Sequence, residues 1–428
     1  MLKNQTSADS YYAATAHPAK AHPALDRDIE VDVAIVGGGF TGIASALSLA
    51  ERGFSVAVAD ANQVGWGASG RNGGQVLAGW SGDGEFAKQV GAKAEEFLWR
   101  TRYLGNEIIE ARLKKYAIEC DYTLGAATVA LNARQMTMLE AEFADCAAHG
   151  QADMLSLADD AGIRRHVGTT MYCGGLIDRR GAHCHPLNLC LGEAAAATNL
   201  GVQIFENTQV TSIEHGASPV VVTEHGRIRA KHVILAGNAY HTLEKQRLDG
   251  YMLPAKTYVL TTEPLDEATA SELLPDNLAF CDANWVLDYF RLTADRRMLF
   301  GGRCTYSNRD IDDIEGAIAP RMREIFPQLK SVKTEYAWGG VIGIPLNRVP
   351  LIGRVSDNVL FAQGYAGHGV NCSHIVGEMF ADAIEGQNAA VDLFESTRHF
   401  KIPAADQIGG PMLALGMSYF RLRDRLGI

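Results

Sequence analysis

The sequence predicts an α/β protein that combines a parallel sheet with a second, antiparallel layer. A strand, a helix and a further strand follow one another within residues 31–60, as in a parallel βαβ unit. Residues 250–335 are instead rich in strands, with one helix around Asp312–Ile325. At roughly 150 residues per domain, the 428-residue chain has room for two to three domains and a large core.

The βαβ unit begins with the β-branched run Val31–Val36, which predicts a buried parallel strand that stops at Gly37. Apolar residues at helical spacing follow the glycines and end near Gly53, where a glycine that terminates a helix belongs. The next strand, Phe54–Asp60, completes the unit.

Glycines 37, 39 and 42 form a G-x-G-x-x-G motif at the start of that helix, and Asp60 ends the second strand. The missing side chains let the backbone approach a pyrophosphate, which the helix N-terminus attracts with free N–H groups and about half a positive charge. The Asp60 carboxylate can bond ribose hydroxyls. The unit therefore predicts a Rossmann-like dinucleotide site, with a purely structural turn as the alternative.

Glycine is the one unusual feature of the composition, at 44 of 428 residues against about 7% in an average protein. Besides the motif, glycines gather at residues 65–74 and 364–369. The first cluster is either a solvent loop or a stretch that wraps a large planar ligand. The second lies between a buried strand, Leu360–Ala362, and a helix, Val370–Ile384. That helix N-terminus would face an electron-rich group, for which an anionic reduced flavin is suited.

The remaining elements are less regular. Residues 85–150 are helical and charged, with a strand expected at Ala127–Leu131. Pro186–Leu200 predicts an amphipathic helix with Pro186 in its first turn, and strands are expected at Val202–Phe205 and Lys231–Leu235.

Composition excludes several classes of protein. The net charge of −11 argues against a nucleic-acid partner. No apolar run has the length of a signal-peptide core or a membrane span, and the eight cysteines lack paired spacing. We therefore expect a cytoplasmic protein with reduced thiols.

Six segments together resemble one family: GGGFTG (37–42), GASGRNGGQ (67–75), GAHCHPLNL (181–189), VILAGNAY (233–240), YFRLTADRRMLFGG (289–302) and GYAGHGV (364–370). They resemble the FAD-dependent D-amino-acid-oxidase-like (DAO) superfamily and, within it, the γ-glutamylputrescine oxidase group. The resemblance extends over the whole chain, from SYYAATA near its start to YFRLRDRLGI at its end.

The resemblance implies a Rossmann-like FAD-binding domain of the DAO/glutathione-reductase type and an antiparallel-sheet α+β substrate domain. We expect the FAD-binding domain in three segments, 30–85, 151–245 and 336–395, and the substrate domain in two, 86–150 and 246–335. Residues 1–29 would form an N-terminal arm and residues 396–428 a C-terminal extension.

The cofactor that the resemblance implies is FAD, held non-covalently, because residues 335–359 lack the cysteine through which sarcosine-type relatives attach flavin. The positions implied around FAD are Gly37, Gly39, Phe40, Thr41, Gly42, Asp60, Ala61, Gly67, Ala68, Ser69, Arg71, Asn72, Gly73, Gly74, Gln75, Val210, Ala236, Gly237, Gly340, Gly367, His368, Gly369 and Val370.

Two positions depart from relatives that oxidise amino acids. Ile342 stands where those relatives have an arginine for the substrate carboxylate, and Asn371 stands where some sarcosine-type relatives have a lysine. A carboxylate beside the reacting amine would be poorly compensated without either cation. This favours a primary amine on an alkyl chain as substrate.

His368 is the first catalytic candidate, with a structural role as a helix cap as the alternative, and Lys256 is a second, for oxygen activation, unless it is a solvated strand residue. The substrate-binding candidates are Tyr258, Trp285, Tyr289, Trp338 and Ile342. Their aromatic rings could line a channel for a polymethylene amine or belong to the core. No metal site is expected, because His183 and His185 lack a second ligand pair at zinc spacing.

The function that follows is FAD-dependent oxidation of a primary amine, γ-glutamylputrescine or a related γ-glutamyl-polyamine, to an aldehyde, ammonia and hydrogen peroxide in polyamine catabolism. Its partners would be that small amine and O₂. An oxidase or dehydrogenase of glycine, sarcosine or D-amino acids is the alternative enzyme, and a nucleotide-binding protein without turnover is the alternative class. The oligomeric state stays open.

Overall fold

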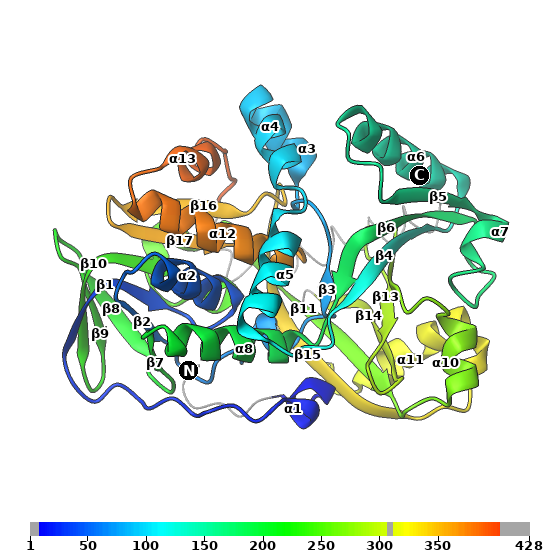
Figure 1. Ribbon diagram of the computed structural model, residues 1–428, viewed down its shortest axis with the longest axis horizontal. Coiled ribbons are helices and arrows are strands. Elements are labelled where there is room, and N and C mark those ends of the chain that lie inside the picture. The colour runs from blue at the N-terminus through cyan, green and yellow to red at the C-terminus, as the bar shows by residue number, and fades with distance from the viewer. Residues whose placement is uncertain (1–7, 306–310, 403–428) are drawn as a thin grey trace.

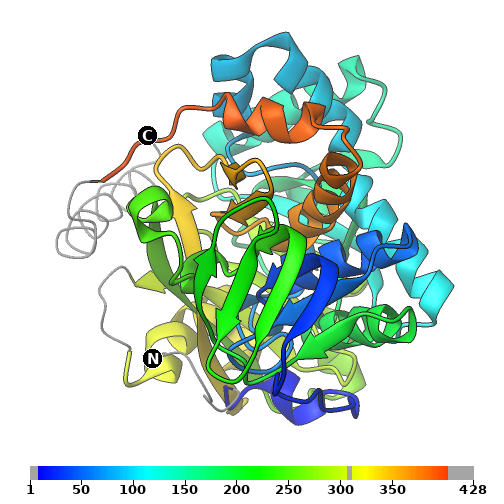
Figure 2. The same ribbon diagram turned by 90° about the vertical axis from the view of Figure 1, so that its left-hand side faces the viewer.

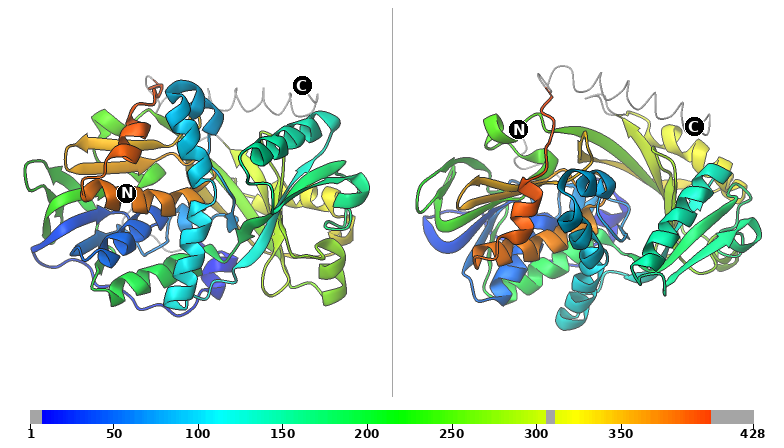
Figure 3. Two further views of the ribbon diagram at one scale, coloured as in Figure 1. Left: turned by 45° about the horizontal axis from the view of Figure 1, so that its top comes forward. Right: turned by 90° about the horizontal axis from the view of Figure 1, so that it is seen from above.

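Two sheets lie side by side in the computed structural model, which describes residues 8–305 and 311–402 (Figure 1). The first sheet has helices packed on it, and the second is a long, curved layer that reaches away from it. Helices α4 (Ala92–Thr101) and α5 (Leu104–Tyr116) stand between the two layers (Figure 3). The molecule therefore has the α/β architecture with a second layer that the sequence predicts.

The first sheet is parallel through its centre, in the order β16-β17-β10-β1-β2-β7 (Figure 2). Its parallel strands are β1 (Ile29–Val36), β2 (Val56–Ala59), β7 (Gln203–Phe205), β10 (Arg227–Leu235) and β17 (Val359–Gln363). β16 (Leu351–Ser356) runs antiparallel at one edge, and β8 (Val210–Glu214) and β9 (Val220–Thr223) form a hairpin that pairs with β10. The expected strands at 31–36, 54–60, 202–205, 231–235 and 360–362 are all present, with bounds shifted by a few residues.

The central strands are apolar over residues 33–36, 56–59 and 233–235, where both faces of the sheet are covered. Val33 and Ile35 of β1 point to the core beneath α2 (Phe40–Glu51), α8 (Pro186–Asn199) and α12 (Gly369–Ile384), whereas Ala34 belongs to a core on the opposite face, against which Val36 also packs. Alternation along a strand sends neighbouring residues to opposite faces, so this sheet needs no polar residues in its middle.

The second sheet is mostly antiparallel, in the order β15-β11-β14-β13-β12-β4-β6-β3. Its strands are β3 (Gln75–Val76), β4 (Thr123–Ala130), β5 (Leu155–Asp159), β6 (Gly174–His183), β11 (Met252–Thr262), β12 (Ala279–Asp282), β13 (Tyr289–Leu292), β14 (Met298–Thr305) and β15 (Thr334–Pro345). Helices α10 (Glu267–Leu273) and α11 (Ile314–Ile325) pack on one part, and α6 (Ala133–Ala148) packs on β4 and β6.

The sheets do not follow the expected segments everywhere. The segment 151–245 contains β5 and β6, which pair in the second sheet, and most of β15 lies within 336–395. Conversely, α5 belongs to the segment 86–150, which was expected in the substrate domain, but it packs against α12 of the first layer. Hydrophobic periodicity identifies a strand but carries no information on which sheet it joins.

Short elements complete the described chain: α1 (Tyr11–Thr15), η1 (Ala68–Gly70), α3 (Asp83–Val90), α7 (Asp160–Ile163), η2 (Asn238–Tyr240), α9 (Lys245–Leu248), η3 (Pro327–Leu329) and α13 (Ala389–Glu395). The expected C-terminal extension lies outside the described residues from position 403 onward. In the described ranges, no helix has both the length and the apolar character needed to cross a membrane.

The N-terminal arm joins the two layers along one side of the molecule (Figure 1). Tyr12 is fully buried against Trp338 of the second sheet, and further along the arm the Leu25 N–H donates to Thr208 Oγ1 (2.9 Å) beside the first sheet. The arm therefore packs on both layers.

Candidate active site

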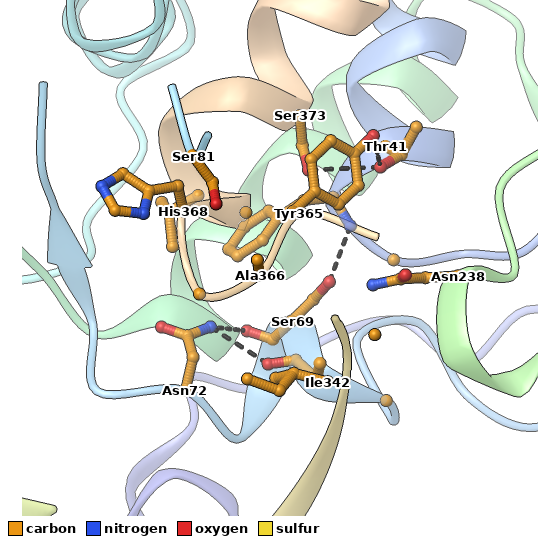
Figure 4. A pocket seen from close by; sticks show the side chains of 18 of the residues that line it. Thr41, Ser69, Asn72, Ser81, Asn238, Ile342, Tyr365, Ala366, His368 and Ser373 are labelled. Carbon is orange, nitrogen blue, oxygen red and sulfur yellow. Dashed lines mark hydrogen bonds between the residues drawn. The ribbon is translucent and has the colours of Figure 1, made fainter. Parts of the chain in front are cut away.

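A cavity of about 940 Å³ opens between the two sheets, and the three glycine clusters all contribute to its lining. Its volume is at the upper end of the range of about 300–1,000 Å³ found for ligand pockets. Figure 4 shows its central part, with Tyr365, Ala366 and His368 on one side and Ser69, Asn72 and Ile342 on the other.

The G-x-G-x-x-G turn closes one end of the cavity. Gly37 has φ +114°, and a Cβ there would lie 2.8 Å from the carbonyl oxygen of Ala236. Gly37 and Gly39 line the cavity, whereas Gly42 does not: a Cβ at Gly42 would lie 1.8 Å from the Gly37 carbonyl oxygen. The expected contact between Gly42 and the cofactor is therefore replaced by close packing of helix α2 on the turn.

Asp60 follows β2 directly, as expected, and faces the same end of the cavity. Its carboxylate accepts the N–H groups of Gly38 (2.6 Å) and Asn62 (2.7 Å). Burial raises the pKa of Asp60. Each carboxylate oxygen has a second lone pair, so the group can also accept sugar hydroxyls.

The glycine-rich segment 65–74 forms the wall of the cavity and is not a solvent loop. Asn72 holds it: its Nδ2 donates to the carbonyl oxygens of Ala68 (3.1 Å) and Ser69 (2.8 Å), and its Oδ1 accepts the Gly74 N–H (2.8 Å). Gly74 itself does not line the cavity, because its backbone faces Cys184, whose carbonyl oxygen would lie 2.2 Å from a Cβ. Gly74 shapes the wall without facing the ligand space.

Arg71 is the cation of this wall. Its Nε donates to the carbonyl oxygen of Trp66 (2.8 Å), and its guanidinium lies 4.5 Å from the centre of the Trp66 ring. Burial lowers the pKa of Arg71. The side chain lines the cavity in a fixed orientation, as expected for a residue beside a ligand.

The third glycine cluster leads into α12, whose first turn faces the cavity (Figure 4). The hydroxyls of Tyr365 and Thr41 are hydrogen-bonded (2.8 Å), which ties this loop to the start of α2. His368 occupies the N-cap position of α12 but its side chain makes no capping hydrogen bond. Burial lowers the pKa of His368, so that a neutral imidazole faces the cavity.

Ile342 of β15, Thr257 of β11 and Tyr289 of β13 line the cavity from the second sheet. A Cβ at Gly73 would lie 2.5 Å from the Tyr289 ring, and one at Gly301 would lie 2.2 Å from it. These two glycines therefore make room for the ring beside the 65–74 wall.

Besides Gly42 and Gly74, three predicted residues do not line the cavity. Thr257 faces the cavity, and strand alternation sends its neighbours Lys256 and Tyr258 to the opposite face. The Tyr258 hydroxyl accepts the Ile311 N–H (3.3 Å) in the core of the second layer. Trp338 shares a face with Ile342 but lies further along β15, where the N-terminal arm covers it.

The other predicted positions line the cavity. They are Gly37, Gly39, Phe40, Thr41, Asp60, Ala61, Gly67, Ala68, Ser69, Arg71, Asn72, Gly73, Gln75, Val210, Ala236, Gly237, Trp285, Tyr289, Gly340, Ile342, Gly367, His368, Gly369 and Val370.

Sequence reasoning missed many lining residues, among them two groups at opposite ends of the cavity. One lies beside Asp60 and includes Asn62, Thr208, Gln209 and Leu243; the other lies at the outer end and includes Trp99, Arg102, Met138, Glu142 and Asp145. The second group comes from helices α4 and α6 and the residue that follows α4. A helical face with apolar and acidic residues has no signature that distinguishes a cavity lining from an ordinary surface.

The residues fit FAD. At one end of the cavity, the Gly37 turn could bind the pyrophosphate of FAD and Asp60 could bind its ribose. The same cavity continues to the space between His368 and Ile342, where the planar ring system could lie. The α12 N-terminus adds a positive dipole end there.

The sequence pattern of the FAD dependent oxidoreductase (DAO) family matches residues 32–383. The chain belongs to this family. It is 42% identical over 421 residues to gamma-glutamylputrescine oxidoreductase of Escherichia coli (strain K12), covering 98% of this chain and 99% of the relative. It is 37% identical to the probable oxidoreductase OrdL of Haemophilus influenzae, covering 97% of each chain.

Among solved structures, glycine oxidase from Geobacillus kaustophilus is similar, with a TM-score of 0.73 at 21% sequence identity over 87% of this chain and 99% of that one. This likeness identifies the DAO-type fold. Family membership makes the chain an FAD-dependent oxidoreductase, with amine and amino-acid oxidases among its relatives. A nucleotide-binding protein without turnover is thereby excluded.

Proposed function

We propose that this enzyme oxidises the primary amine of γ-glutamylputrescine, or of a related γ-glutamylated polyamine, and that O₂ is the electron acceptor. The relative that shares 42% of its residues is named for this substrate. The products would be an aldehyde, ammonia and hydrogen peroxide.

The observation that supports this substrate class most strongly is the side chain at position 342. Ile342 lines the cavity opposite the third glycine cluster and presents an alkyl group there (Figure 4). Ile342 offers no cation to a carboxylate attached to the reacting carbon, and burying an unpaired charge costs several kcal/mol. An amine at the end of a methylene chain has no such need, and the alkyl wall suits its methylene groups.

When bound, FAD supplies the oxidant, which accepts two electrons from the C–H bond beside the amine. The substrate R–CH₂–NH₂ thereby loses two electrons and two protons to give an imine, which water hydrolyses to the aldehyde and ammonia. With O₂ as the final acceptor, the overall reaction would be R–CH₂–NH₂ + O₂ + H₂O giving R–CHO + NH₃ + H₂O₂.

The chain's own residues would orient the amine and handle its proton. The Tyr289 ring and Ile342 exclude water from the alkyl chain, and the neutral His368 imidazole can accept a proton from an incoming ammonium. The positive end of the α12 dipole favours the negative charge that develops on the reduced cofactor.

A substrate panel tests the proposal. Purified FAD-loaded enzyme is assayed for peroxide and ammonia with γ-glutamylputrescine, putrescine, glycine, sarcosine and D-alanine. We expect the highest kcat/KM with γ-glutamylputrescine and one peroxide per ammonia. Turnover of an amino acid with none of the glutamylated amine would refute the substrate class. Ammonia release that needs an added electron acceptor would refute the use of O₂.

A further inference from the structure

The outer end of the cavity is lined by one face of helix α6. Met138, Ala141, Glu142 and Asp145 recur at the spacing i, i+3, i+4, i+7, which places them on a single stripe. Asp145 is exposed, and 55% of Met138 is exposed, so this stripe lies at the mouth of the cavity.

Arg102 faces this stripe from the end of α4. Its Nη2 donates to Glu142 Oε1 (2.8 Å), yet only 14% of the Arg102 side chain is exposed, against 44% for Glu142. Its Nε is buried and has no hydrogen-bond partner within the described ranges. The ion pair with Glu142 engages Nη2, so the Nη1 N–H groups remain for another acceptor.

The position of Arg102 is fixed by its backbone and by aromatic neighbours. Its carbonyl oxygen accepts the N–H of Gly79 (2.7 Å), a residue that also lines the cavity. Its guanidinium lies 5.6 Å from the Trp99 ring centre, and Trp99 stacks on His149 at the end of α6 (3.9 Å between ring centres). These contacts fix the Arg102 guanidinium relative to the acidic stripe of α6.

The two ends of the cavity differ in charge chemistry. The inner end presents Ile342 and Tyr289, whereas the outer end presents the cation Arg102 beside the carboxylates of Glu142 and Asp145. A cation and an anion side by side recognise a zwitterion, since each takes the group of opposite charge. A distal ammonium alone would gain from the carboxylates but would be repelled by Arg102.

We propose that Arg102, Glu142 and Asp145 form a subsite for the α-amino-acid head group of the substrate, at the end remote from the reacting amine. Arg102 binds the α-carboxylate, and the two acidic side chains bind the α-ammonium. This inference rests on the proposed function and assigns its specificity for a γ-glutamyl amine to the mouth of the cavity.

Four amides of putrescine distinguish the contributions of the α-carboxylate and the α-ammonium to binding. γ-Glutamylputrescine carries both, N-glutarylputrescine lacks the ammonium, N-(4-aminobutanoyl)putrescine lacks the carboxylate, and N-acetylputrescine lacks both. All four present the amine of the putrescine end; N-(4-aminobutanoyl)putrescine carries a second primary amine, so its aldehyde product is identified by mass spectrometry. For the wild-type enzyme we expect KM to be lowest for γ-glutamylputrescine and highest for N-acetylputrescine, with kcat similar across the set.

Two substitutions are crossed with these substrates. Arg102→Gln should raise KM about 10- to 100-fold for the two substrates with a carboxylate, as expected for loss of a charged hydrogen bond. It should leave KM for N-acetylputrescine unchanged and lower KM for N-(4-aminobutanoyl)putrescine, because its distal ammonium is no longer repelled. Asp145→Asn should raise KM about two- to fivefold for the two substrates with an ammonium, a smaller effect because Asp145 is exposed. Arg100→Gln is the matched control, an exposed arginine of the same helix outside the cavity lining.

Flavin content and melting temperature establish that each variant is folded. If Arg102→Gln does not fold, the order of the KM values of the wild-type enzyme for the four substrates still tests whether the subsite exists. Equal KM values for all four, or a KM increase in Arg102→Gln that is the same for all four, would overturn the subsite. Failure of the wild-type enzyme to oxidise any of them would instead overturn the proposed function.

Discussion

The substitution Gly37→Ala tests whether the first glycine turn holds the cofactor. Gly37 has φ +114°, and a Cβ would lie 2.8 Å from the oxygen and 2.9 Å from the carbon of the Ala236 carbonyl group. Both backbones are fixed, since the Gly37 N–H donates to Ala59 and the Ala236 N–H donates to Val36. No side-chain rotation can relieve this contact.

Gly53 supplies the matched control. It has φ +86° at the end of α2, and a Cβ there would meet nothing within 4 Å. The left-handed backbone alone costs about 1–2 kcal/mol for an alanine at either position. Forcing an extra methyl group into a packed region adds about 1–3 kcal/mol. At Gly37 this strain would distort backbone that lines the cavity.

The assay is the FAD-to-protein ratio of the purified variants, followed by titration of the apoproteins with FAD and by melting curves. We expect Gly53→Ala to lower the melting temperature slightly and to bind FAD like the wild type. Gly37→Ala should bind FAD at least about tenfold more weakly, the equivalent of about 1.4 kcal/mol. Stoichiometric FAD with unchanged affinity in Gly37→Ala would show that the cofactor does not approach this turn.

Three further predictions concern other parts of the structure. Ile342→Arg should lower kcat/KM for γ-glutamylputrescine at least about tenfold in steady-state assays, because a buried cation would repel the ammonium of the arriving substrate. Burial raises the pKa of Asp282 from 3.8 to about 8, so the stability that the protonated carboxyl contributes is complete below about pH 4 and is lost as pH rises through about 8. The melting temperature of Asp282→Asn should therefore fall less than that of the wild type between pH 5 and pH 9. Glu193→Ala removes a fully buried carboxylate that accepts from Arg112 (3.0 Å) and His374 (3.1 Å), which should cost about 3–5 kcal/mol in chemical denaturation.

Each of these expectations has a clear contrary result. Undiminished kcat/KM in Ile342→Arg would mean that this side chain does not border the amine. Parallel pH profiles for Asp282→Asn and the wild type would mean that the carboxyl ionises freely in the folded protein. Unfolding of Glu193→Ala at the wild-type denaturant concentration would mean that the buried ion pairs contribute nothing to stability.

Local signals in the sequence predict the first layer well. The βαβ unit, its glycine turn and Asp60 lie within 30 residues, so that strand, helix and motif constrain one another. The roles of individual glycines are harder to predict, because Gly37 and Gly73 line the cavity whereas Gly42 and Gly74 do not, although a Cβ would meet protein atoms at all four. That difference depends on what packs across from each residue.

Long-range pairing limits the rest of the prediction. The sequence identifies β11 as a strand, but only its pairing with β14 and β15 determines that Thr257 rather than Lys256 or Tyr258 faces the cavity. A shift of one residue exchanges the two faces of a strand. The outer end of the cavity depends on α6, which ends 33 residues before the motif at 181–189 and reaches the site through its packing on β4 and β6.

Anaerobic titration of the FAD-loaded enzyme with γ-glutamylputrescine tests the central claim most directly, because it observes electron transfer from substrate to cofactor without a coupled reaction. We predict that the yellow absorbance bleaches in full at about one equivalent of substrate and returns when O₂ is admitted. An absorbance that stays unchanged with γ-glutamylputrescine but bleaches with glycine, sarcosine or a D-amino acid would contradict it.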